Sequence, residues 1–192
     1  MYEDERKEII EYGLHQGKVM LVWVLTVLFL GYNFHIFEQS ILFLIAFVSL
    51  RRFAGGYHAE SQEVCYVISF LVLVVTFFLI KEEFFTSLWT RWQQIFGIVT
   101  IMILVPVENN NHILTNEERV EYGNKTRIIT IILFAIYVIS EKRGYLKIAN
   151  SIGASIVLVL ISLVIGFVKR YIAKKDDFAK DSVQVKRRKF LH

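Results

Sequence analysis

The 192-residue chain contains only one cysteine and one proline, and these scarcities limit its structure and chemistry. A single cysteine cannot form an intramolecular disulfide, so the fold is not held together by disulfide bridges. The five histidines are scattered at positions 15, 35, 58, 112 and 192, and no Cys/His cluster has zinc-ligand spacing. No bound metal is therefore expected.

Glycine-rich phosphate loops are also lacking, because the Gly55-Gly56 pair on its own fits no nucleotide-binding pattern. Kinase or ATPase chemistry has no support, and no cofactor is expected. The basic residues between positions 169 and 189 directly follow a hydrophobic run. Lipid headgroups are the nearest anions to such a segment, so a role in binding nucleic acid is not expected.

Hydrophobic residues make up 55% of the chain and aromatic residues 15%, which is unusual for a soluble globular domain. A helix needs roughly 20 residues to cross the hydrocarbon core of a membrane. Two runs without Asp, Glu, Lys or Arg are clearly shorter than this, 39–50 and 128–140. The other four approach spanning length, namely 19–37, 64–80, 92–107 and 148–168. The composition predicts an all-α, polytopic integral membrane protein with six or four spans.

The placement of Lys and Arg favours six spans, because these residues are retained on the cytoplasmic side of a membrane. Thirteen Lys and Arg precede the basic tail. With six spans eight of them face the cytoplasm, whereas with four spans only five do. We therefore predict a multi-pass protein of the cell membrane with both termini cytoplasmic, and re-entrant geometry for residues 39–50 stays open.

Two domain-level segments are predicted. Residues 1–168 form one membrane-embedded domain, in which Ile9, Ile10 and Leu14 are the apolar face of a short interfacial helix or pack on the first span. The N-terminus lacks a small-residue cleavage site and reads as retained. Residues 169–192 form a basic cytoplasmic tail, which is expected to be flexible and attracted to anionic lipid.

The stretch RRFAGGYHAESQEVC, residues 51–65, places His58 near the only cysteine, Cys65. An imidazole can take the proton of a thiol to give a reactive thiolate, and can later return it to a leaving amine. Arg51 and Arg52 could favour the thiolate or bind an acidic substrate. Taken alone, these residues also fit a core cysteine, an interfacial histidine and arginine topology anchors.

The same residues also suit a small transporter or channel in which Arg51, Arg52 and His58 line a polar path. The predicted spans contain no internal acidic residue and little Gly/Pro interruption, so a coupling-ion site is hard to find. A noncatalytic membrane scaffold is a third possibility. The residues alone leave these three classes open.

An arginine before a Gly-Gly-x-His element, with a cysteine seven residues after the histidine, resembles the accessory gene regulator B (AgrB) family. These are bacterial membrane cysteine peptidases that process quorum-sensing propeptides. Arg51, Gly55, Gly56, His58 and Cys65 fit this pattern. The resemblance also extends to chain length, the hydrophobic layout, Tyr12-Gly13-Leu14 and Pro106-Val107.

The resemblance implies a cysteine endopeptidase in which His58 and Cys65 are catalytic and Arg51, Gly55 and Gly56 support the site. A precursor peptide, docked at the cytoplasmic leaflet, is cleaved through an acyl-enzyme thioester, and an internal cysteine of the precursor then closes a thiolactone ring.

Members of the family have basic residues just before the fifth span. Lys125 and Arg127 match these residues in charge, but they do not form a contiguous basic cluster. Lys125, Arg127 and Arg52 are possible substrate-binding residues. They fit equally well as positive charges that anchor the topology of the chain in the membrane.

The separation of His58 and Cys65 raises a geometric question. On one continuous helix, residues seven apart are ~10.5 Å apart along the axis, which exceeds the roughly 3 Å needed for proton transfer. Either the helix breaks between them, which puts Cys65 near a helix N-terminus, or the histidine of one subunit serves the cysteine of another in a homodimer. The break within one chain is the favoured arrangement.

Overall fold

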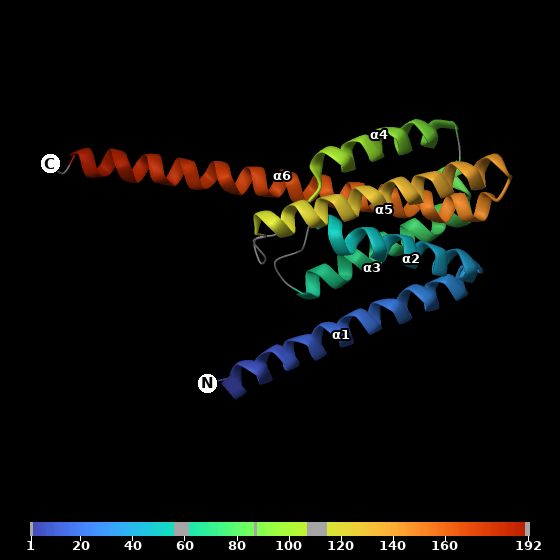
Figure 1. Ribbon diagram of the computed structural model, residues 1–192, viewed down its shortest axis with the longest axis horizontal. Coiled ribbons are helices and arrows are strands. Elements are labelled where there is room, and N and C mark those ends of the chain that lie inside the picture. The colour runs from blue at the N-terminus through green and yellow to red at the C-terminus, as the bar shows by residue number, and fades with distance from the viewer. Residues whose placement is uncertain (1, 56–61, 87, 107–114, 191–192) are drawn as a thin grey trace.

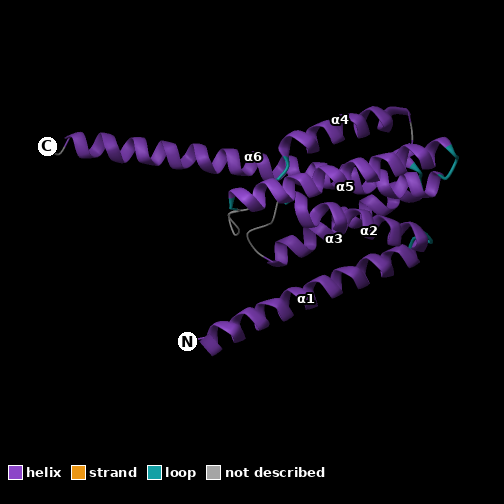
Figure 2. Ribbon diagram, in the orientation of Figure 1, coloured by secondary structure: helices purple, strands orange, loops and turns teal. Residues whose placement is uncertain are grey.

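The computed structural model describes residues 2–55, 62–86, 88–106 and 115–190. Within these ranges the chain forms helices and turns and no strand (Figure 2), which confirms the predicted all-α fold. A short 3-10 turn, η1, lies at Phe84–Thr86. The helices are α1 (Tyr2–Asn33), α2 (Phe37–Ala54), α3 (Gln62–Lys81), α4 (Leu88–Leu104), α5 (Asn116–Lys142) and α6 (Leu146–Phe190).

Successive helices run in opposite directions through the molecule (Figure 1). As a result, the end of α2, the start of α3, the end of α4 and the start of α5 lie at one end of the bundle, on the left of the view. We call this the motif end, because residues 51–55 and 62–65 belong to it. The opposite end holds the turns that join α1 to α2, α3 to α4 and α5 to α6.

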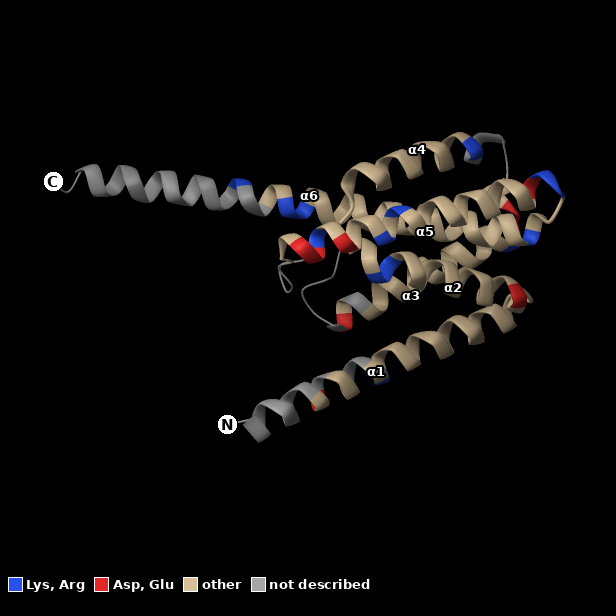
Figure 3. Ribbon diagram, viewed as in Figure 1, with Lys and Arg blue, Asp and Glu red and all other residues tan. Residues whose placement is uncertain are grey.

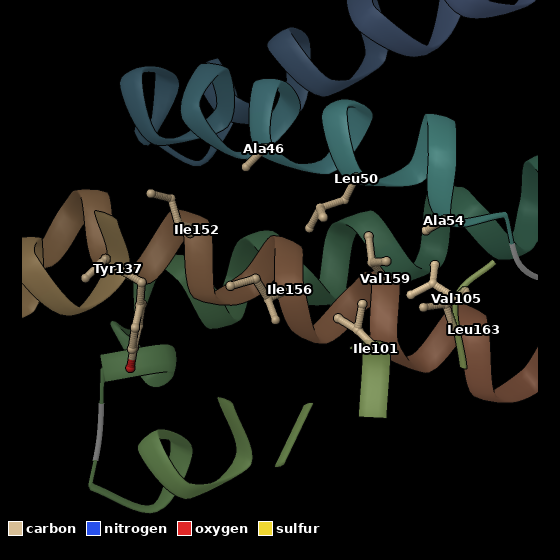
Figure 4. Close-up of a cluster of buried hydrophobic side chains, with 11 residues drawn as sticks. Ala46, Leu50, Ala54, Ile101, Val105, Tyr137, Ile152, Ile156, Val159 and Leu163 are labelled. Atoms are coloured by element: carbon tan, nitrogen blue, oxygen red, sulfur yellow. The ribbon is translucent and has the colours of Figure 1, made fainter. Parts of the chain in front are cut away.

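Helix α6 is the centre of the packing, and α2 lies along it. One apolar cluster joins these two helices to α4 and α5, and it includes Leu50, Ile101, Tyr137 and Ile156 (Figure 4). A second cluster joins α1, α2 and α3 to α6. Helix α1 therefore packs on the bundle from one side, and Figure 1 shows it diverging from the other helices toward its N-terminus.

The outer surface has the character expected of a lipid-facing protein. Large apolar side chains are widely exposed on the outer helices, with exposed fractions of 67% for Phe29, 70% for Phe96 and 74% for Ile103. Figure 3 shows the charged residues gathered near the two ends of the bundle, with few between them. Such an extensive apolar surface marks contact with a membrane or a partner rather than water.

Two of the described helical segments are long and apolar enough to cross a membrane, Asn116–Lys142 and Leu146–Ile172. Three shorter apolar segments accompany them, Gly17–Asn33, Tyr66–Lys81 and Arg91–Leu104. The alternating directions of the helices agree with the order of sides derived from the charge placement. Six full spans with both termini cytoplasmic remain a prediction.

Both terminal segments continue the helices beside them. Residues 2–16 are joined to the first hydrophobic run in the single helix α1, where Ile10 and Leu14 are exposed. Helix α6 continues to Phe190 and projects beyond the bundle (Figure 1), so the basic tail is helical through residue 190, while its flexibility and its attraction to anionic lipid stay predictions. Residues 169–190 contain no proline or glycine, and adding residues to an existing helix avoids the cost of a new nucleus.

Buried polar side chains fix η1 against α6 at the opposite end. The side chain of Asn150 is fully buried; its Oδ1 accepts from the Phe85 backbone N at 2.9 Å, and its Nδ2 donates to the Ile80 carbonyl. The Tyr137 hydroxyl donates to the Phe85 carbonyl at 3.2 Å, and the Gln94 amide donates to the Gly153 carbonyl at 2.9 Å. The two bonds to Phe85 satisfy a backbone donor and an acceptor of the short turn, and the Gln94 bond joins α4 to α6.

Asn150→Ala is expected to destabilise the fold, because it leaves the buried Phe85 amide unpaired and removes one of the two donors to the Ile80 carbonyl, which also accepts from the Glu83 amide. An unsatisfied buried group costs about 1–3 kcal/mol. The expected result is a clearly lower unfolding temperature in detergent micelles. Asn33→Ala is the matched control, since the exposed Asn33 amide donates to a carbonyl of its own helix. Equal unfolding temperatures for the two variants would contradict the structural role of Asn150.

Candidate active site

The first part of the motif ends helix α2. Gly55 is the C-cap residue of α2, with φ 71° and ψ −147°. This backbone conformation is strained for residues with a Cβ atom, so glycine is required here. The Arg51 guanidinium donates to the Gly55 carbonyl, while Ala54 is fully buried in the core shared with α4 and α6. Arg51 and Gly55 therefore fix the direction in which the chain leaves α2.

Cys65 is the fourth residue of α3, which begins at Gln62. The described backbone agrees with the prediction that the cysteine lies near a helix N-terminus. His58 and Gly56 lie outside the described residues, and the described part of the chain places only the backbone of Cys65. The proposed contact between His58 and Cys65 stays a prediction.

An aromatic contact that the sequence analysis missed lies directly beside Cys65. The rings of Tyr66 on α3 and Trp23 on α1 are stacked, with centroids 5.5 Å apart and planes 10° apart. This contact holds the first turns of α3 against α1. The position of Tyr66 immediately after the cysteine could have indicated this contact in the sequence.

The basic candidates Arg52 and Lys125 meet at one aromatic side chain. The Arg52 guanidinium carbon lies 5.6 Å from the centre of the Phe53 ring, and the Lys125 Nζ lies 5.4 Å from it. The Phe53 ring also makes an edge contact with Tyr122, at 5.8 Å between centroids. The start of α5 is thereby held against the end of α2. Phe53 and Tyr122 were not singled out from the sequence, although an aromatic residue directly after two arginines was a signal.

The cations of Arg52 and Lys125 are both accessible. Arg52 is exposed, and Lys125 forms an exposed ion pair with Glu121 on the preceding turn of α5, at 2.5 Å. An exposed ion pair contributes little to stability. We call Arg52, Phe53 and Lys125 the basic-aromatic group, and its charges are available to an acidic ligand at the motif end.

Arg127 has a different environment. Its Nε donates to the Met102 carbonyl in the last turn of α4 at 3.3 Å, and its Nη1 lies 3.3 Å from the Asn124 side-chain oxygen. The Met102 carbonyl would normally accept from the amide four residues later, but that residue is Pro106, which has no N–H. Arg127 thus supplies a donor that the α4 terminus lacks, a role that the proline four residues after Met102 could have indicated.

Substitution distinguishes the structural role of Arg127 from the exposed position of Lys125. Arg127→Met is expected to lower the free energy of unfolding by about 1–3 kcal/mol, because the Met102 carbonyl loses its donor. Lys125→Met, which also removes one cation from α5, is expected to change it by less than about 1 kcal/mol. Thermal unfolding of both variants in the same detergent measures this difference. Greater destabilisation by Lys125→Met would overturn the assignment.

The family model for accessory gene regulator B matches residues 1–166 of this chain. The chain is similar to two AgrB-like proteins of Clostridium perfringens. With that of strain 13 it is 32% identical over 142 residues, which cover 69% of this chain and 66% of the relative, slightly less than two thirds. With that of strain SM101 it is 30% identical over 175 residues, which cover 86% of this chain and 79% of the relative.

No solved structure matches the chain significantly. The family match covers both halves of the candidate site, the end of α2 and the start of α3, and extends into α6. It indicates a membrane protein of the agr quorum-sensing system. On this match, the chain belongs to the accessory gene regulator B family.

Proposed function

We propose that this protein is a membrane-embedded cysteine endopeptidase that cleaves the C-terminal part of a quorum-sensing precursor peptide and promotes closure of a thiolactone ring. The observation that carries the proposal is the position of Cys65. The only cysteine of the chain stands in the first turn of α3, within a motif whose Arg51 and Gly55 shape the end of α2. A helix N-terminus favours an anionic group, here the thiolate.

In the first step, His58 takes the thiol proton and the Cys65 sulfur attacks the carbonyl carbon of the scissile peptide bond. The carbon–nitrogen bond then breaks. The leaving amine receives the proton from His58, which is the usual role of a general acid. The N-terminal part of the precursor remains bound to Cys65 as a thioester, and the C-terminal fragment departs.

In the second step, a cysteine within the precursor attacks the thioester carbonyl. Its proton passes to His58 and then to the departing Cys65 sulfur, so that the enzyme is regenerated and the precursor holds a thiolactone ring. Water competes with this attack and would give a linear product. A site at the protected boundary of a membrane domain limits that competition.

The supporting residues take three roles in this proposal. Arg51, Gly55 and Gly56 set the course of the chain between α2 and α3. Arg52 and Lys125, whose cations converge on Phe53, attract acidic residues of the precursor. Arg127 stabilises the end of α4 and acts on the substrate only through that contact.

The proposed setting is a bacterial cell membrane that the chain crosses six times, with both termini in the cytoplasm. The alternation of helix directions and the grouping of charges at the two ends support it. The precursor then docks at the cytoplasmic leaflet, and the basic extension of α6 lies near anionic headgroups. Within the described residues the transporter alternative gains no support, since Arg51 borders a largely apolar groove there.

Reconstitution tests the proposal. The purified protein in lipid nanodiscs is mixed with a synthetic precursor, encoded beside its gene and containing an internal cysteine, and the products are analysed by mass spectrometry. The expected products are a C-terminal fragment and a cyclic peptide lighter by one water than the linear hydrolysis product. Intact precursor after prolonged incubation with folded protein would contradict the proposal.

A further inference from the structure

A groove of about 350 Å³ lies between helices α1, α2, α3 and α6. Its walls are apolar apart from Arg51 and the hydroxyl groups of Ser69 and Ser162. This volume is within the range of about 300–1,000 Å³ that is usual for small-ligand pockets. Lining side chains from the four helices include Trp23, Phe47, Val72 and Leu158.

The groove leads to the candidate active site along α3. Ile68, Ser69 and Val72 line it, and Cys65 precedes them by three, four and seven residues on the same helix. Positions with these spacings share one face of an α-helix. Position 65 therefore continues the lining face of α3 by one turn toward the motif end.

The groove leads to the same place along α2. Val48 and Arg51 line it three residues apart, and the Arg51 side chain donates to the Gly55 carbonyl at the end of the helix. Across the groove, Trp23 of α1 is stacked on Tyr66, the residue after Cys65. Both walls thus lead toward the motif end, where the backbone of Cys65 continues the lining face of α3.

We infer that this groove binds bulky apolar side chains on the acyl side of the cleaved peptide bond; the inference rests on the proposed function. The acyl side is favoured because that part of the precursor stays attached to Cys65 through both steps, whereas the other fragment departs after the first. Apolar contacts on the acyl side hold the thioester in place and exclude the water that would hydrolyse it. Val72, at the centre of the lining face of α3, is a specificity-determining residue.

A membrane lipid is the competing occupant, since an acyl chain suits the same walls and Arg51 suits an anionic headgroup. A lipid seated there would place its headgroup beside the nucleophile and obstruct every peptide. Continuity between the groove and the position of Cys65 therefore favours the peptide.

Two cysteine-directed labels test the inference, acetyl-Gly-Phe-chloromethyl ketone and acetyl-Gly-Ala-chloromethyl ketone. Each places its last side chain where the acyl-side residue of a substrate would lie. Because Cys65 is the only cysteine, a gain in intact mass that the Cys65→Ala variant does not show reports its modification alone. The full-length protein in detergent is expected to react with the phenylalanine label about tenfold faster than with the alanine label, since one apolar group in a pocket gives at least this discrimination.

Substitution of two valines on α3, one inside the groove and one outside it, tests whether the label preference arises in the groove. Val72→Phe fills the groove and is expected to bring the ratio of the two rates close to one, because the phenylalanine label loses the space for its ring. Val75→Phe adds the same bulk at a position that is 58% exposed and outside the groove, and is expected to keep the wild-type ratio. Equal rates for the two labels with the wild-type protein, or the same ratio in both variants, would overturn the inference.

The lipid alternative is tested in the same assay by adding phosphatidylglycerol to the micelles, with phosphatidylcholine as the control. Loss of the phenylalanine preference with phosphatidylglycerol alone would assign the groove to anionic lipid and overturn the peptide assignment. An unchanged preference supports it. The two proposals fail on different results. If the label preference is kept but the precursor is not cleaved, the proposed function is contradicted and the assignment of the groove is not. If cleavage depends on Cys65 but neither label is preferred, only the assignment of the groove is contradicted.

Discussion

Cys65→Ala is expected to reduce precursor cleavage to the uncatalysed background, because both proposed steps pass through the sulfur of this residue. Neither the C-terminal fragment nor the cyclic peptide should be found by mass spectrometry after incubation with the purified variant. Position 65 lies in the first turn of α3 and alanine suits a helix well, so the variant should insert and fold. Its unfolding temperature in detergent serves as the check on folding.

The conservative variant tests the chemistry more finely. Cys65→Ser keeps a nucleophilic atom but replaces the thiol with a hydroxyl, which the same imidazole deprotonates far less readily. We expect a loss on the order of 10³-fold or more in the rate of cleavage. Retained cleavage in purified Cys65→Ala would remove the proposed mechanism, whereas full activity of Cys65→Ser would exclude a dependence on the thiolate.

Hydrophobic runs and charge placement predicted the all-α fold and the order of the helices, since both are imposed by the membrane as a solvent. The ends of the first and last helices were harder to predict. Residues 2–16 were predicted as a short interfacial helix or a cap on the first span, and residues 169–190, which are charged and lack an apolar period, as a tail. Their backbones nevertheless extend α1 and α6, because an existing helix propagates at little cost where no proline stops it.

His58 and Cys65 were singled out by their chemistry and the motif as a whole by its resemblance to a known family, but the contacts around the motif were not predicted. The stacking of Trp23 on Tyr66 and the approach of Lys125 to Phe53 join residues far apart in the chain. Such contacts depend on how the helices pack, which a single sequence does not encode in a local pattern. The role of Arg127 is an intermediate case, because Pro106 shows that a carbonyl lacks its donor but not which residue supplies it.

His58→Ala is expected to slow precursor cleavage by about 10²–10⁴-fold, the usual contribution of a general acid and base. The loss should exceed that of His35→Ala, which changes an exposed histidine at the opposite end of the bundle. Initial rates of fragment release by the purified proteins in nanodiscs give the comparison. Equal rates for the two variants would remove His58 from the mechanism.

The remaining question is whether His58 serves the cysteine of its own chain. Helix α2 ends at Ala54 and the described part of α3 begins at Gln62, three residues before Cys65, which leaves room for the break that pairing within one chain needs. We therefore expect the pair to form within one chain. Co-purified dimers of one His58→Ala chain and one Cys65→Ala chain should be inactive, since neither chain holds both groups.

A dimer that pairs a wild-type chain with a chain carrying both substitutions is the matched control. Within-chain pairing predicts that this control keeps about half of the wild-type activity, because a symmetric dimer has two equivalent sites and one of them stays intact. Pairing between chains predicts the reverse: the mixed single variants would recover about half of the activity and the control would be inactive. Recovery in the mixed single variants would thus move the site to a subunit interface and make the dimer the catalytic unit.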